Sequence, residues 1–368
     1  MSTRIIKAEL QDDADIRALL RESPVNGSIR IAFSREPSYF EAVTVEGSVV
    51  DTLICRCNED ARVVGLGSRA EKRVFINGRP GTAGYLGGLR ILPEYRSGMV
   101  LARGYRELQR AHVLGKARLY ITSIVEDNEE AYELLTSQRA GLPVYDDYGK
   151  YYTMALKPAH KPRRQSSAGM MVRRATPGDI PAILHYLKSY AHQRQFYPCY
   201  EARDFDAGLL RGLRAHDLYV CMQGHVLRGC MGLWDQSEFR QQTVHGYVGL
   251  LRLLRPAWNA YARVAGIPAL PRTGSKMQPA LLSMWHIRDE DRNVFNALLD
   301  VCLGDAAERR DCDFVLLGMH ERDPLLAHAR KRRHYPFVSR ILLVYWSDGT
   351  SDRQALDTRP PYFELGGL

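Results

Sequence analysis

Apolar and polar positions follow the same order in the two halves of the chain. In the first half, a short apolar run at residues 5–8 is followed by a helical pattern at residues 15–20. In the second half, a similar run at residues 171–175 is followed by a helical pattern at residues 179–184. Each pair is followed by an apolar, glycine-bearing run typical of a strand, at residues 63–67 and 227–233. Because a strand, a helix and a second strand recur in this order, we interpret the chain as two copies of one α/β unit.

A stretch without periodicity separates the two copies. Residues 157–169 combine proline, basic and small polar residues, which is typical of a connector between domains. We predict an N-terminal domain at residues 1–157, a linker at 158–170 and a C-terminal domain at 171–348, followed by a tail at 349–368. The expected fold class is α/β (α+β), each domain having a mixed central sheet flanked by helices.

A strand, a short loop and a helix follow one another in the first half. Residues 85–92 have the composition of a strand, residues 93–99 that of a turn, and apolar side chains recur at helical spacing from Leu101 onward. The start of a helix presents free backbone N–H groups and the positive end of its dipole. Arg96 adds charge there, and Gly98 allows close approach of the backbone. The junction therefore predicts an anion site, for which a pyrophosphate is the usual occupant.

This junction resembles the acyl-coenzyme A loop of the GNAT superfamily of N-acyltransferases. The resemblance is carried by the residues LRILPEYRSG and by the helix that follows them. It implies a cofactor-binding set in which the first four residues face the pantetheine arm and the last five face the pyrophosphate: Leu89, Arg90, Ile91, Leu92, Arg96, Ser97, Gly98, Met99 and Val100. The loop is one residue shorter than the family's Arg/Gln-x-x-Gly-x-Gly/Ala pattern, with Val100 where a second Gly or Ala is expected.

The next strand and helix extend the resemblance. Residues 119–124 predict a strand, and Asp127 and Glu130 predict a capping box that opens a helix. Asn128 begins an Asn-x-x-Ala motif like that of the family, so the resemblance assigns it to the cofactor as well. Leu135 stands where many relatives have a tyrosine general acid, but a thiolate leaving group does not strictly need one. Three nearby tyrosines are substitutes, although packing is their more usual role: Tyr132, Tyr145 and Tyr148.

The corresponding junction in the second half has lost these features. A strand at residues 280–287 is followed by an acidic stretch, 288–291, and then by a helical pattern. Carboxylates at a helix start stabilise the helix, but they repel the pyrophosphate that the same place would bind. We therefore predict a degenerate second copy, as in tandem GNAT proteins that keep one working half. Downstream, Asp323 is expected to cap a helix whose last turn carries the basic run 330–334.

An insert interrupts the second half at about residues 247–279. Residues 240–288 contain no Asp or Glu, whereas apolar and basic residues occur there at mostly helical spacing. We predict a basic amphipathic helix followed by a proline-rich loop. Three roles are open for it: a lid over an acyl or anionic substrate, contact with an anionic membrane surface, or a structural helix between the domains. His245 and His286 border the insert and are expected to be core or rim residues.

The composition narrows the class of protein. The chain has 368 residues, of which 45% are hydrophobic and 25% are charged, values that fit about two globular domains. A net charge of +9 favours an anionic ligand or surface without requiring nucleic acid. Seven scattered cysteines, among them Cys55 and Cys57, predict reduced thiols and no metal site. Because residues 1–20 resemble neither a signal peptide nor a membrane span, we expect a cytoplasmic protein.

These observations and the resemblance combine in one expected function. It is an N-acyltransferase, most simply acetyl-CoA-dependent, that moves an acyl group from an acyl-CoA cosubstrate to an amine on a small molecule or peptide. Strand 85–92 carries no glutamate, so a general base would come from Glu41, Glu46 or the second domain. Two rival functions stay open: an aminoacyl-tRNA-dependent transferase of tandem GNAT fold, and a non-catalytic GNAT-like sensor or scaffold.

Overall fold

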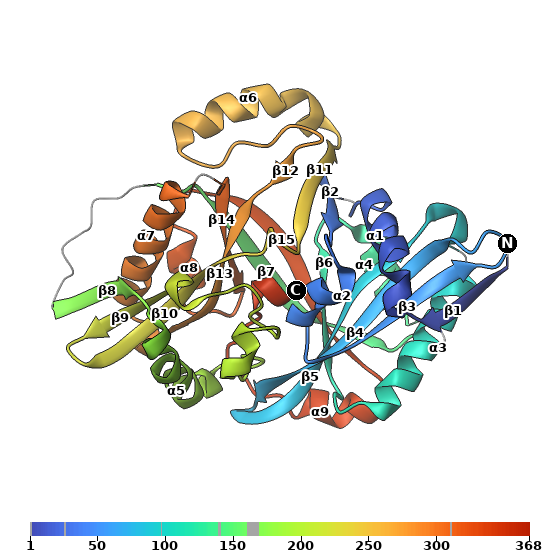
Figure 1. Ribbon diagram of the computed structural model, residues 1–368, viewed down its shortest axis with the longest axis horizontal. Coiled ribbons are helices and arrows are strands. Elements are labelled where there is room, and N and C mark those ends of the chain that lie inside the picture. Colours follow the sequence, from blue (N-terminus) through green and yellow to red (C-terminus); the bar gives the residue numbers. More distant parts are fainter. Residues whose placement is uncertain (1, 26, 97, 139–140, 160–168, 310) are drawn as a thin grey trace.

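The computed structural model describes residues 2–25, 27–96, 98–138, 141–159, 169–309 and 311–368 (Figure 1). The predicted linker at 158–170 lies mostly outside the described residues. Twelve strands form one continuous sheet: β1 Thr3–Lys7, β3 Val49–Cys57, β4 Val63–Ile76, β5 Arg79–Ile91, β6 Tyr120–Val125, β7 Val144–Leu156, β8 Met170–Arg174, β9 Leu218–Gln223, β10 Val226–Asp235, β13 Pro279–Ile287, β14 Phe314–His320 and β15 His334–Tyr345. The α-helices of the described residues are α1 Asp13–Glu22, α2 Tyr39–Ala42, α3 Gly98–Leu114, α4 Glu129–Thr136, α5 Ile180–Tyr190, α6 Leu250–Ala265, α7 Arg292–Glu308, α8 Leu326–Ala329 and α9 Thr350–Gln354.

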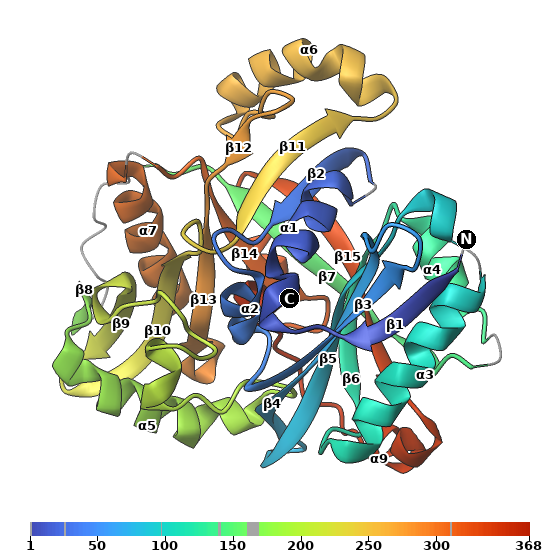
Figure 2. The ribbon, with the colours of Figure 1, turned by 45° about the vertical axis from the view of Figure 1, so that its right-hand side comes forward.

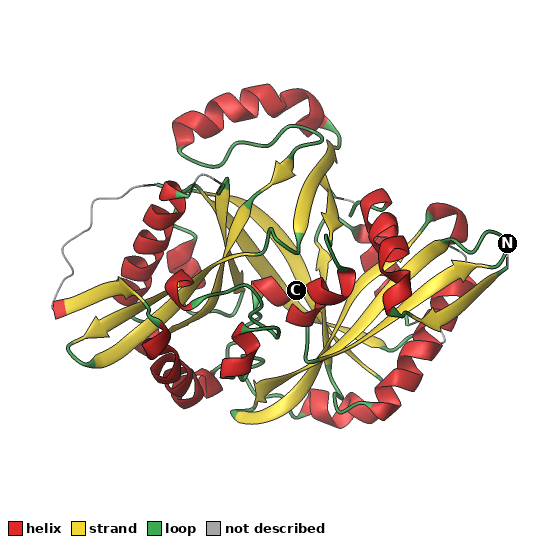
Figure 3. Ribbon diagram, in the orientation of Figure 1, coloured by secondary structure: helices red, strands yellow, loops and turns green. Residues whose placement is uncertain are grey.

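The sheet repeats one strand order in its two halves, as the recurring pattern of the sequence predicts. The order is β1-β3-β4-β5-β6 at one end and β8-β9-β10-β13-β14 at the other, with β15 and β7 between them. Helices cover the strands of both halves (Figure 3). The mixed α/β fold class expected from the sequence is confirmed.

The two central strands are exchanged between the halves. β7, the last strand of the first half, pairs with β14 of the second half, and β15, the last strand of the second half, pairs with β6 of the first. β7 and β15 also pair with each other, antiparallel, from His334↔Leu156 to Tyr345↔Val144. Each half therefore completes its sheet with a strand of the other, a feature that the predicted domain boundaries do not express.

The first half is buried on both faces of its sheet. The neighbouring residues Leu53 and Ile54 of β3 belong to opposite hydrophobic cores, because successive side chains of a strand point to opposite faces. Leu20 of α1 packs in one of these cores and Tyr105 of α3 in the other. Glycine-bearing strands with few polar side chains suit such two-sided burial.

Two helix starts differ from those expected. Asn128, not Asp127, caps α4, because its side-chain oxygen accepts from the Ala131 N–H at 3.3 Å. Asp323 is a buried partner of Arg194, at 3.1 Å, and α8 begins three residues later, at Leu326. The basic run 330–334 follows α8 and leads into β15, so the expectation that it fills the last turn of a helix is wrong.

The segment predicted as an insert builds a separate ribbon. β11, Gln241–Tyr247, pairs with β2, Ile29–Ser34, of the first half and with the short β12, Lys276–Met277. α6 sits at the end of this ribbon and stands off from the rest of the molecule (Figure 2). Gly266, in the left-handed conformation with φ 69°, ends α6.

Two further expectations concern the cysteine thiols and a membrane-spanning helix. All seven cysteines carry free thiols, and Cys55 and Cys57 are both buried in the core of β3. Among the described residues, the structure has no helix of sufficient length and apolarity to cross a bilayer.

Candidate functional site

The strands β5 and β6 separate in the middle of the first half. They run parallel and pair only at Gly84↔Tyr120 and Tyr85↔Ile121. Gly84 is required there, since a Cβ atom would lie 2.0 Å from the Tyr120 ring. Beyond it, Gly88 adopts φ 68° where the register with β4 shifts. Strands that part in this way leave main-chain N–H and C=O groups available to a ligand.

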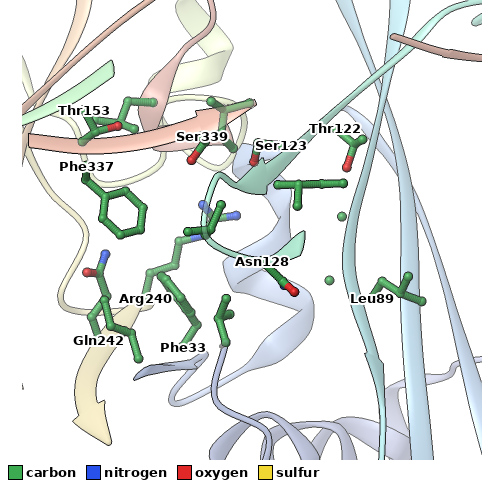
Figure 4. Close-up of a pocket in the computed structure, with 18 of the residues that line it drawn as sticks. Phe33, Leu89, Thr122, Ser123, Asn128, Thr153, Arg240, Gln242, Phe337 and Ser339 are labelled. Carbon is green, nitrogen blue, oxygen red and sulfur yellow. The ribbon is translucent and has the colours of Figure 1, made fainter. Parts of the chain in front are cut away.

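A cavity of about 480 Å³ opens from this separation and extends between the two halves. Figure 4 shows Leu89, Thr122, Ser123 and Asn128 of the first half on one side and Gln242 and Phe337 of the second half on the other. Its volume lies within the range of roughly 300–1,000 Å³ usual for small-molecule sites. The site is therefore built by both halves together.

Three arginines and one glutamate give part of this cavity a positive charge. Arg240 pairs with Glu46 at 2.5 Å, and both side chains are buried. Arg35, just after β2, has one hydrogen bond among the described residues, to the Ser34 carbonyl at 3.1 Å, and no ion pair. Arg90 donates to the Leu89 carbonyl at 2.7 Å, and its Nε is buried without a partner. Among the described residues, neither Arg35 nor Arg90 has a carboxylate at ion-pair distance, although the charge of Glu46 acts on Arg35 across the cavity.

Burial lowers the pKa values of two of these arginines. Desolvation, together with the nearby positive charge of Arg240, lowers the pKa of Arg35 to about 9. Desolvation likewise lowers the pKa of Arg90. The lowered pKa values reflect the free-energy cost of keeping these two cations away from water. A bound anion would offset part of that cost.

The other part of the cavity is apolar. Leu108 of α3, Leu135 of α4 and Ile124 of β6 line it there. Tyr105 and Tyr145, whose hydroxyl groups are hydrogen-bonded to each other, line it as well. Desolvation raises the pKa of Tyr105 to about 12. A smaller cavity of about 50 Å³ continues beside it and shares several lining residues. This end suits a hydrocarbon chain.

The structure divides the residues that the GNAT resemblance assigns to the cofactor. Leu89, Arg90 and Asn128 line the large cavity, whereas Ile91 and Val100 line only the smaller one. Leu92 is buried in the core beneath α1 and does not line the large cavity. Of the four residues expected to face a pantetheine arm, Leu89 and Arg90 thus line the large cavity, and their contact with a cofactor stays a prediction.

The described residues of the loop before α3 do not line the large cavity. Arg96 is about half exposed, donates to the Ile91 carbonyl at 3.1 Å and lies 3.6 Å from the Glu130 carboxylate. Gly98 begins α3, and Met99 is exposed. Ser97 lies outside the described residues. The assignment of this loop to a pyrophosphate stays a prediction.

The carboxylates considered as a general base have other partners. Glu41 is exposed and pairs with Arg211 at 2.6 Å, outside the cavity. Glu46 does line the cavity, but Arg240 holds one of its oxygens and the other is buried. Glu46 therefore acts as a counter-charge within the site. Leu135, Tyr132 and Tyr148 provide no acid in the cavity, since the first is apolar and the tyrosines do not line it.

The counterpart of this site in the second half is filled by the chain itself. β13 corresponds to β5, and its Met284 has φ 53° where the register with β10 is irregular. The Met284 N–H donates to the Glu364 carboxylate at 2.8 Å, which also accepts from the hydroxyls of Tyr200 and Tyr362. The predicted acidic stretch is present: Asp291 caps α7 through the Asn293 N–H at 2.8 Å. Both features support a second half that takes no thioester.

Sequence reasoning missed Arg35, Arg240 and Glu364. Arg35 and Glu364 are isolated charges in stretches without a motif, and Arg240 was noted only as the start of the region without acidic residues. The two arginines approach Glu46 and Arg90 only because β2 pairs with β11 across the halves. The composition around Glu364 could have indicated its burial, because the segment 360–368 is rich in apolar and aromatic residues and therefore predicts a buried tail.

Comparison with known proteins places this fold in one class. The chain has the fold of the GNAT-like acyl-CoA N-acyltransferases. It is similar to N-myristoyltransferase of Saccharomyces cerevisiae with bound myristoyl-CoA, at a TM-score of 0.59, 12% identity and coverage of 93% of this chain and 82% of that chain.

Two further solved structures share the fold at 11% identity. A probable N-acyltransferase of Enterococcus faecalis and a GCN5-related N-acetyltransferase of Anabaena variabilis each have a TM-score of 0.52, with 93% of this chain and 72% of that chain covered. No protein-family model and no curated protein sequence matches the chain.

Proposed function

We propose that the protein is an acyl-CoA-dependent N-acyltransferase whose site lies between β5 and β6. The observation that carries this proposal is the separation of these strands at Gly84 and Tyr85, which opens directly into the large cavity. Leu89 and Arg90 would hold the pantetheine arm, and Arg96, Ser97 and Gly98 the pyrophosphate. The similar fold of proteins that bind myristoyl-CoA supports the assignment.

The reaction follows from placing a thioester in this gap. A neutral amine attacks the thioester carbonyl, the C–N bond forms and the C–S bond breaks. The nitrogen loses one proton, and the departing CoA thiolate gains one, so the products are an amide and free CoA. Main-chain N–H groups next to Gly88 would stabilise the negative charge that develops on the carbonyl oxygen. Holding the amine and the thioester together in one cavity supplies the favourable geometry.

We further propose that the acyl chain is longer than acetyl. Acetyl is the simplest acyl group for the GNAT resemblance, but the apolar end of the cavity, from Leu135 to Tyr105, has room that an acetyl group would leave empty. Burying each additional CH₂ there is worth about 0.8 kcal/mol. A chain of medium or greater length would therefore bind more tightly.

Thermal unfolding with acetyl-, octanoyl- and myristoyl-CoA tests both proposals. A ligand at about one hundred times its Kd adds roughly 2.7 kcal/mol to the free energy of unfolding, a shift of several degrees in Tm. We expect larger shifts with the longer chains. The variant Leu135→Phe narrows the apolar end, so its response to myristoyl-CoA should fall while its response to acetyl-CoA persists. No shift with any acyl-CoA would contradict the proposal and favour the tRNA-dependent or the scaffold alternative.

We also propose that the acceptor substrate carries an anionic group beside its amine. Arg35 follows β2, which belongs to the ribbon on the far side of the cavity from β5, so it would meet the acceptor and leave Arg90 for the cofactor. An unpaired, desolvated guanidinium binds a carboxylate strongly through two parallel hydrogen bonds. An α-amino acid, or a peptide with a carboxylate near its amino group, has this chemistry.

A pair of acceptors that differ by one carboxylate tests this proposal. Phenylalanine should be acylated with a kcat/KM at least about tenfold above that of phenethylamine, which lacks the carboxylate. Arg35→Gln should remove this preference, whereas Arg30→Gln, at an exposed arginine of β2, should keep it. Equal rates for both amines, with the acyl-CoA shift retained, would refute the anionic acceptor and leave the acyltransferase proposal intact.

A further inference from the structure

The helix α6 has two apolar faces, and the body of the protein covers only one. The inner face, one side of the helix at i, i+4, i+7, i+8 and i+11 spacing, is partly or fully buried and consists of Leu251, Arg255, Trp258, Asn259 and Ala262. The outer face has the spacing of a second stripe and consists of Leu250, Leu253, Leu254, Ala257, Tyr261 and Val264. Leu253 is 76% exposed and Val264 is 84% exposed. Soluble surfaces seldom gather so many large apolar side chains on one helix.

The charge around this stripe is of one sign. Arg252 and Arg263 lie on α6 and are exposed, and the whole stretch 240–288 contains no acidic residue. By helical spacing, Arg252 and Arg263 lie on a flank of α6 away from the middle of the stripe. The stripe matches the apolar boundary of a lipid surface, and the long arginine side chains and the positive charge of the whole stretch favour anionic headgroups. α6 has 16 residues, about 24 Å of helix, which suits a position in the plane of the interface.

The inner face ties α6 to the wall of the cavity. The Asn259 side chain bonds both main-chain groups of Leu270, at 3.0 and 2.8 Å. Arg255 donates to the Leu270 and Pro271 carbonyls, each at 3.2 Å. Leu270 and Pro271 line the large cavity. A partner surface that binds the outer face of α6 would therefore lie close to the cavity.

We propose that α6 docks the protein on an anionic phospholipid surface, with the stripe of Leu250, Leu253, Leu254, Tyr261 and Val264 buried in the interface. The position of α6 at the extremity of the molecule leaves this face accessible to a flat surface (Figures 1 and 2). The proposal does not depend on the acyltransferase reaction. It assigns the predicted insert to membrane contact, which the sequence left open beside a lid and a structural role.

Co-sedimentation with vesicles tests this proposal. The full-length protein should sediment with vesicles of phosphatidylcholine and phosphatidylglycerol at 0.1 M salt and at least fivefold less with phosphatidylcholine alone. The double variant Leu253→Glu, Leu254→Glu should lose binding, and Arg252→Gln with Arg263→Gln should weaken binding to the anionic vesicles.

A matched control uses two adjacent exposed apolar residues elsewhere. Val113 and Leu114 at the end of α3 are 69% and 89% exposed, and the change of both to Glu should leave vesicle binding unaltered. Equal loss in this control would overturn the proposal. So would a wild-type protein that stays in solution with anionic vesicles, or one that instead forms a dimer in sedimentation velocity that Leu253→Glu, Leu254→Glu abolishes. All substituted residues are exposed, and an unchanged Tm would confirm that each variant is folded.

Discussion

Single residues differ in how far their roles follow from the chain alone. Leu89 and Arg90 could be assigned because they belong to a continuous motif, and the structure brings both to the cavity. Arg35 could not, because its position depends on the pairing of β2 with a strand more than 200 residues away. Similarly, Asn128 and not Asp127 caps α4, a choice between neighbours that only the backbone geometry decides.

Arg96 gives a prediction for the cofactor loop. Arg96→Gln removes an exposed guanidinium from the loop before α3, and we expect acyl-CoA affinity to fall about 10- to 150-fold, the usual worth of a hydrogen bond to a charged group. Arg110→Gln is the control, since Arg110 is exposed on α3 and pairs with Glu107 of the same helix. Calorimetric titration measures both. Unaltered affinity in Arg96→Gln would remove the loop from the binding site.

His286 gives a prediction for the pH dependence of stability. Desolvation, and then the charges of Arg194 and His192, lower its pKa to about 3, and its Nδ1 lies 2.9 Å from the Tyr186 hydroxyl oxygen. The unfolded chain, with a histidine pKa near 6.5, binds the proton more readily than the folded one. Stability is therefore full above pH 6.5 and falls, by at most about 1.4 kcal/mol per pH unit, as the pH drops toward 3.

The test compares His286→Phe with the wild type by urea unfolding at pH 7.5, 6 and 5. The variant should lose stability less steeply between pH 6.5 and 5, and Tyr186 can still donate to the Arg228 carbonyl at 3.2 Å. His245→Gln, at an exposed position, should keep the wild-type slope. His320, whose pKa desolvation lowers to about 4, contributes in the same direction and explains a residual slope.

Elements were predictable where their sequence pattern is local. The helices α1, α3, α4 and α7 and the strands at residues 63–67, 119–124 and 280–287 follow from spacing within a few turns, and the structure confirms them. The short α8 and the basic run after it were misplaced, because Asp323 is buried against Arg194 and accepts from the Leu325 N–H in a turn that precedes the helix. Burial by a distant partner overrides a local signal in this case.

The cap of α4 gives a prediction at this scale. Asn128→Ala removes the oxygen that accepts from the Ala131 N–H and should lower the free energy of unfolding by about 1 kcal/mol. Asn128→Asp retains an acceptor at the same place and should stay within a few tenths of the wild type. Chemical unfolding measures both, and equal losses in the two variants would show that the cap contributes nothing.

At the scale of the whole molecule, the exchange of β7 and β15 between the halves could not be predicted from the sequence. The repeat of one α/β unit was visible as a pattern, but the exchange of β7 and β15 is a pairing between segments about 190 residues apart, for which no local signal exists. The cavity depends on this exchange, since Thr153 of β7 and Phe337 and Ser339 of β15 line it. Domain boundaries drawn at 157 and 171 therefore separate segments that share one site.

Separate expression of the halves tests this dependence. Residues 1–157 lack β15 and residues 171–368 lack β7, so each fragment should expose unpaired strand edges and aggregate or unfold when alone. Co-expression should yield a complex with a single thermal transition. A folded, monomeric 1–157 fragment in circular dichroism and gel filtration would show that β7 can take the place of β15, and the halves would then be independent domains.

The exchanged strands also set an order of events during translation. The ribosome completes β6 early, but its neighbour β15 emerges only after nearly all of the second half has been made. Until then, β6 keeps an open edge that could pair with another nascent chain. We therefore expect this edge to stay open throughout the synthesis of the second half, and the site between the halves to form only after β15 has left the ribosome.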